Sequence, residues 1–94
     1  MSRQSDARLV QHVMVRLMNE IDSIKLDIGQ ARTITVGIPS DEHITEDVRL
    51  SMFANSITSQ LQADGYWVAS VKIITTFSEE RVQQDVQVSF ASNP

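Results

Sequence analysis

The chain has 94 residues, of which 41% are hydrophobic, and a formal net charge of −4. This length fits one domain spanning residues 1–94, and the acidic balance argues against broad binding of nucleic acid or anionic membranes. The absence of cysteine excludes disulfides, thiolate metal sites and cysteine nucleophiles. Because no apolar run approaches ~18–20 residues and residues 1–6 are unlike a signal peptide, we expect a cytoplasmic protein.

The first expected element is a helix over residues 6–28. Its apolar residues recur at spacings of four and three, which places them on one helix face. They are Val10, Met14, Leu17, Ile21, Ile24 and Ile28. We expect Ser2 or Ser5 to cap the start of this helix, and Gly29 to end it in a left-handed conformation.

Residues 33–38 alternate between apolar and polar side chains, which predicts a short strand that Pro39 ends. A second helix is expected over residues 46–63, capped by Thr45 or Ser40 and closed by Gly65. Its core-facing residues are expected to be Leu50, Phe53, Ala54, Ile57 and Leu61.

The C-terminal part predicts a hairpin of strands 66–77 and 82–90 around a turn at residues 78–81. Pairing the apolar faces of the two strands fixes the register, because a slip of one residue would move every side chain of one strand to the opposite face of the sheet. The matched pairs are Phe77 with Val82, Ile73 with Val86, Val71 with Val88 and Ala69 with Phe90, while the polar residues Thr75 and Gln84 meet each other. Trp67 would also face the core.

These elements predict an α+β fold, a two-layer sandwich in the order α-β-α-β-β. The strand–helix–strand unit should place its two strands parallel, so we expect two helices on one face of a three-stranded mixed sheet. The strand order stays open, because the first strand can lie beside the second or beside the third.

The sequence offers no constellation typical of catalysis. Its three glycines form no phosphate-binding loop, and His12 and His43 belong to different predicted helices. We therefore expect a protein without enzymatic activity, catalytic residues or a cofactor.

Four carboxylates and His43 lie within residues 41–47 and could bind a divalent cation. The stretch lacks the glycine of a calcium loop, and acidic residues are favoured at a helix N-terminus. We therefore predict no metal there; a small enzyme or a divalent-cation binder using this stretch remains the less favoured alternative.

Arg8, His12 and Arg16 lie four residues apart and form one ridge of the first helix. This ridge, extended by Arg3, could contact an anion or a nucleic acid, and a nucleic-acid-binding module is the alternative function. The net charge favours the simpler interpretation of a solvated helix face.

Two surfaces are candidates for a partner interface. Ile44, Val48 and Met52 recur every four residues, nearly opposite the core face of the second helix, unless the helix starts after Val48 and Ile44 closes the core from the loop. The outer sheet face is expected to carry Tyr66, Val68 and Ile74 among small neutral residues.

Together these features predict a small non-enzymatic protein–protein interaction or assembly module, of a type common among phage-encoded, viral and accessory proteins. We expect a protein partner, with a homodimer or other homo-oligomer as the favoured form.

Overall fold

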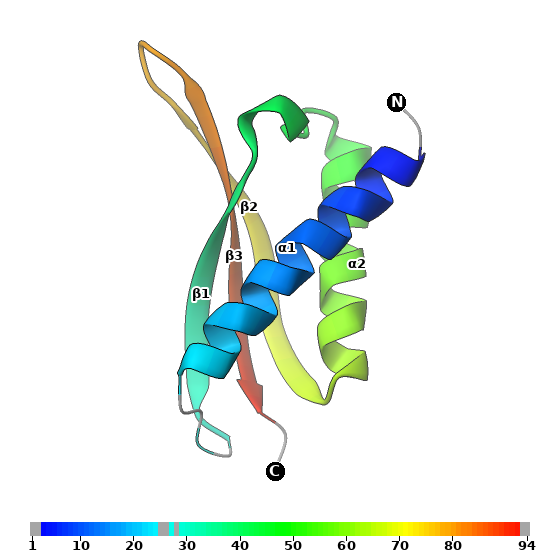
Figure 1. Ribbon diagram of the computed structural model, residues 1–94, viewed down its shortest axis with the longest axis vertical. Coiled ribbons are helices and arrows are strands. Elements are labelled where there is room, and N and C mark those ends of the chain that lie inside the picture. Colours follow the sequence, from blue (N-terminus) through cyan, green and yellow to red (C-terminus); the bar gives the residue numbers. More distant parts are fainter. Residues whose placement is uncertain (1–2, 25–26, 28, 93–94) are drawn as a thin grey trace.

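The computed structural model describes residues 3–24, 27 and 29–92, and it has the predicted order α-β-α-β-β (Figure 1). A short 3₁₀ turn that the sequence did not predict, η1, lies between the first strand and the second helix. The elements are α1 (Arg3–Ser23), β1 (Ala31–Ile38), η1 (Ser40–Glu42), α2 (Asp47–Ala63), β2 (Tyr66–Phe77) and β3 (Val82–Ser92).

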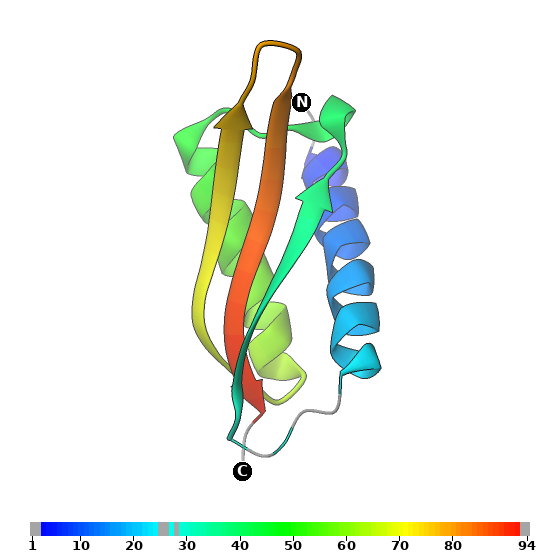
Figure 2. The same cartoon turned by 90° about the vertical axis from the view of Figure 1, so that its left-hand side faces the viewer.

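The described strands form one sheet in the order β1-β3-β2, and both pairings in it are antiparallel. The prediction of a mixed sheet was therefore wrong. The two strands that flank α2 do point the same way, but β3 lies between them, so they never pair. Figure 2 shows the open face of this sheet, with both helices packed behind it.

The core lies between the sheet and the two helices. The predicted stripe of α1 is confirmed from Val10 to Ile21, although Ile24 is only half-buried and Ile28 lies outside the described residues. Buried residues of both helices, of the sheet and of the segment before α2 form one cluster, which consists of Leu9, Val10, Val13, Met14, Leu17, Ile21, Val36, Ile38, Ile44, Phe53, Ile57, Leu61, Val86, Val88 and Phe90.

The bounds of α1 differ from the prediction at both ends. The helix begins at Arg3, so Ser5 lies inside it and not at its cap, and Ser2 lies outside the described residues. It ends at Ser23, six residues before Gly29. Gly29 does adopt a left-handed φ of 76°, but its N–H donates to Ser92 O, which joins the connection to the end of β3.

The bounds of α2 agree with the prediction to within one residue, whereas the predicted N-cap was wrong. Gly65 has a φ of 95°, which the absence of a Cβ allows, and its N–H donates to Gln62 O. At the start, neither Thr45 nor Ser40 is the cap. Glu46 occupies that position, and no side-chain hydrogen bond caps the helix within the described part of the chain.

The hairpin register is confirmed for the four pairs from Phe77–Val82 down to Val71–Val88. The fifth predicted pair was wrong, because Phe90 lies opposite Val68 and Ala69 is an extra residue on β2. Such a β-bulge reverses the faces of all residues before it. Tyr66 and Val68 therefore turn toward the helices and pack against the core, whereas Trp67 lies on the open face with 58% of its surface exposed.

Candidate interaction surface

The helix half of the predicted interface is partly corrected by the structure. Ile44 is 1% exposed, because α2 starts only at Asp47 and Ile44 closes the core from the preceding loop. The alternative that the sequence left open placed Ile44 correctly, but it started the helix after Val48, whereas α2 begins at Asp47. Val48 and Met52 stay on the surface, with 70% and 61% of their areas exposed.

The sheet half is corrected more strongly. The prediction that Tyr66 and Val68 face outward was wrong, because the bulge at Ala69 turns both toward the helices. Tyr66 meets Phe90 edge-on, with 5.7 Å between the ring centroids. Ile74 remains exposed, so the open sheet face carries Ile74 and Trp67 as its large apolar side chains.

The basic ridge on α1 is exposed, as its spacing predicted, since Arg8, His12 and Arg16 all lie on the surface. Arg16 also has a structural contact, because its Nη1 donates to Gly37 O of β1 at 3.1 Å. The ridge therefore offers two side chains and part of a third for contact with an anion.

The acidic stretch is divided between two elements. Asp41 and Glu42 belong to η1, whereas Asp47 begins α2, so Glu42 and Glu46 do not share a helix face. Within the residues that the structure describes, no three His, Asp or Glu side chains gather closely enough to hold a metal ion.

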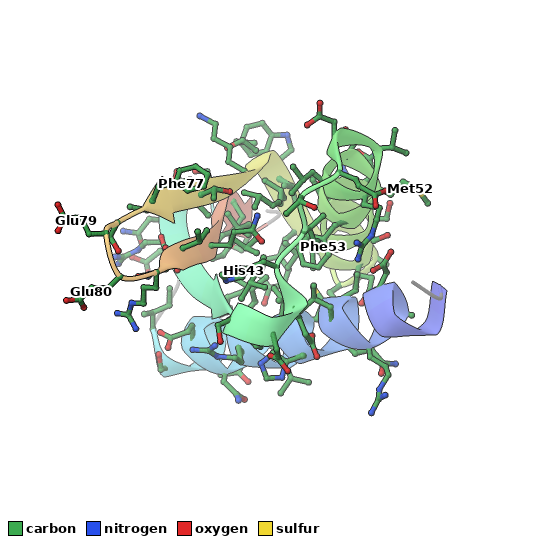
Figure 3. All side chains as sticks on the ribbon, turned by 90° about the horizontal axis from the view of Figure 1, so that it is seen from above. His43, Met52, Phe53, Phe77, Glu79 and Glu80 are labelled. Carbon is green, nitrogen blue, oxygen red and sulfur yellow. The ribbon has the colours of Figure 1, made fainter. Side chains whose placement is uncertain are left out.

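An apolar concavity that the sequence did not predict lies between the β2–β3 hairpin and the segment that precedes α2. We name it the hairpin pocket. It has a volume of about 330 Å³ and is lined by His43, Ile44, Thr45, Leu50, Thr75, Phe77, Val82 and Gln84. Figure 3 shows Phe77 on the hairpin and His43 on the facing segment.

The hairpin pocket exists because β2 is longer than the helix beside it. At ~3.3 Å per residue the 12 residues of β2 span ~40 Å, whereas at 1.5 Å per residue the 17 residues of α2 span ~26 Å. α2 ends and β2 begins at the Asp64–Gly65 turn, so the excess length of β2 appears at its other end, at the hairpin. Phe77 and Val82 line the pocket from the hairpin, with 77% and 39% of their areas exposed.

Gln84 forms the floor of the hairpin pocket and fixes its far wall. Its Oε1 accepts from the Ile44 N–H at 2.8 Å, and its Nε2 donates to Ile44 O at 2.6 Å. Nε2 also donates to Thr75 Oγ1 at 3.1 Å, which confirms the predicted meeting of these two residues. Both amide hydrogens are thus used inside the protein, so the floor has no free donor for a ligand.

A second, more polar pocket of about 290 Å³ adjoins the hairpin pocket on the side of β1. It shares His43, Val82 and Gln84 with it and adds Arg81 and Asp85. His43 therefore stands between the two pockets. The two together form a bent groove under the hairpin.

A third pocket of about 220 Å³ lies between the first turns of α1 and α2, beside Met52. Arg49 spans it and donates two hydrogen bonds to Asp6, one of them from Nε at 3.1 Å. These hydrogen bonds lower the pKa of the Asp6 carboxyl, while partial burial opposes the shift. The contact between Arg49 and Asp6 is the one ion pair among the described residues, and it joins the two helices.

Comparisons with known proteins give no relative to argue from. A scan of protein-family models and searches of curated proteins and of solved structures found no match to this chain. Neither helix in the described part of the chain combines the length and apolar character needed to cross a bilayer.

Proposed function

We propose that this chain is a non-enzymatic protein-interaction module, and that it binds its partner through the hairpin pocket. The observation that carries this proposal is the exposure of Phe77 above an apolar concavity. Exposed apolar side chains that gather beside a concavity can mark an interaction site, whereas single ones scattered over a surface are ordinary. Burying each would contribute up to about 1.5–3 kcal/mol before the costs of association.

The chemistry of the hairpin pocket favours binding over catalysis. His43 is the one titratable side chain among its described lining residues. The Gln84 amide hydrogens are already bound to Ile44 and Thr75. A general acid–base site usually pairs one titratable group with a second one or with an activated nucleophile, whereas an apolar anchor needs neither.

A peptide-display selection tests the proposal. Peptides selected on the wild-type protein should lose at least about tenfold in affinity for Phe77→Ser, since an apolar anchor would lose its main contact. Trp67→Ser is the matched control, because it removes an exposed aromatic from the opposite face of the same strand. The proposal is refuted if the selection yields no binders, or if Phe77→Ser binds them as the wild type does.

Self-association is a second proposal, and it uses a different surface. Val48 and Met52 lie one turn apart on α2 and are both exposed. A two-fold contact through them would place the same residues on both sides. Light scattering over a concentration series should then show a dimer that Val48→Glu and Met52→Lys each convert to a folded monomer. A wild-type protein that stays monomeric at high micromolar concentration contradicts self-association.

A further inference from the structure

Exposed carboxylates, which we call the acidic rim, lie at the end of the molecule that holds the hairpin pocket, outside the residues that line it. Six exposed carboxylates, half of the 12 acidic residues of the chain, lie on the segments that border it. They are Asp41, Glu42, Glu46, Asp47, Glu79 and Glu80. Figure 1 places η1, the start of α2 and the hairpin tip at the same end of the molecule, and Figure 3 shows Glu79 and Glu80 at that tip.

Three arginines lie near this rim. Arg81 ends the hairpin turn, and Arg16 donates to Gly37 O beside the adjoining pocket. The guanidinium of Arg49 is bound to Asp6 on the other side of α2. Half of the carboxylates of the chain lie at the end of the molecule that holds the apolar hollow.

The position of two of these carboxylates is not explained by the needs of the fold. Asp47 suits the positive end of the α2 dipole. Glu79 and Glu80 have no such role, because the turn is held by Ser78, whose N–H and hydroxyl both donate to Arg81 O. Two adjacent like charges at the tip repel each other and contribute nothing to the ladder.

We propose that the partner segment bound by the hairpin pocket is cationic, with one large apolar side chain flanked by Lys or Arg. This inference rests on the proposed function and names the chemistry of its partner. The apolar side chain packs against Phe77 and Val82, while its basic neighbours lie against the rim. Complementary charge speeds association and sets the choice of partner more than it adds affinity. The same rim repels the identical end of a second copy, so this surface selects a different protein.

Three synthetic peptides of equal length test the charge requirement. The first has a central leucine flanked by lysines, the second has the same leucine flanked by glutamates, and the third has lysines around a central alanine. We expect measurable binding of the first alone in a fluorescence titration, weakening as salt is added.

Charge reversal on the protein provides the matched comparison. Glu79→Lys combined with Glu80→Lys should lower the affinity for the lysine–leucine peptide by about tenfold, equivalent to ~1.4 kcal/mol. Glu20→Lys combined with Asp22→Lys makes the same change in net charge on the surface of α1, toward its C-terminal end, and should leave the affinity nearly unchanged.

The outcomes separate this inference from the proposed function. If the two leucine peptides bind equally and Phe77→Ser abolishes both, the charge requirement is wrong and the pocket still binds. If the lysine peptides bind whether or not leucine and Phe77 are present, the attraction is a general one and both proposals fail. If no peptide binds, both are overturned as well.

Discussion

Replacing Gln84 by leucine should destabilise the domain severely, although leucine is similar in size and the position is 2% exposed. In the wild type the Gln84 amide satisfies both the N–H and the C=O of Ile44, which is itself buried. Leucine can bond neither group. Each stranded buried backbone group costs about 1–3 kcal/mol, so we expect a loss of about 2–6 kcal/mol.

That loss is large relative to the total free energy of unfolding. A chain of 94 residues has a free energy of unfolding of about 5–14 kcal/mol at ~0.05–0.15 kcal/mol per residue. Urea denaturation followed by circular dichroism measures the difference. Thr75→Val is the control, because it removes only the third bond of Gln84, at an exposed partner, and should cost about 1 kcal/mol or less.

Amide exchange locates the effect. In the wild type the Ile44 N–H should be protected by its 2.8 Å bond to Gln84, and in Gln84→Leu it should exchange faster than the amides of β3. The reasoning is refuted if Gln84→Leu unfolds within about 0.5 kcal/mol of the wild type, or if Ile44 exchange does not change.

Three further changes test other parts of the fold by urea denaturation. Val86→Asp should unfold the domain, because Val86 has no exposed surface and a buried lone carboxylate costs several kcal/mol. Asp6→Asn should cost up to about 1 kcal/mol at neutral pH; because Arg49 lowers the pKa of Asp6, this difference should disappear as the pH falls through that lowered pKa. Deleting Ala69 should leave a folded protein within about 1 kcal/mol of the wild type, since it only removes the bulge; an unfolded product would contradict the register.

The spacing of apolar residues was sufficient to predict the helices and strands that bury one face along their length. The stripe from Val10 to Ile21 and the alternation of β1 each mark one face, and both faces are buried as predicted. The hairpin register followed from two apolar faces that match only one way. Gly65 could be predicted because a helix that turns directly into a strand needs a residue with positive φ.

The errors arose where a contact distant in sequence overrides the local pattern. The stripe of α1 continues to Ile28, yet the helix ends at Ser23, because the chain must still reach β1 beside the end of β3. The bulge at Ala69 is also hidden from periodicity, since both registers place an apolar residue opposite Phe90. The bulged one buries the larger Val68 and lets Tyr66 pack against the Phe90 ring.

The candidate site was missed for a different reason. Alternation correctly placed Phe77 and Val82 on the helix side of the hairpin, but it indicates only the face and not whether a helix covers it. The lengths of the two elements did contain the information, because a strand of 12 residues extends farther from the turn than the helix of 17 residues that ends there. Apolar residues in the uncovered excess cannot belong to the core. They are exposed at the end of the hairpin, and this exposure is what the proposed partner would remove.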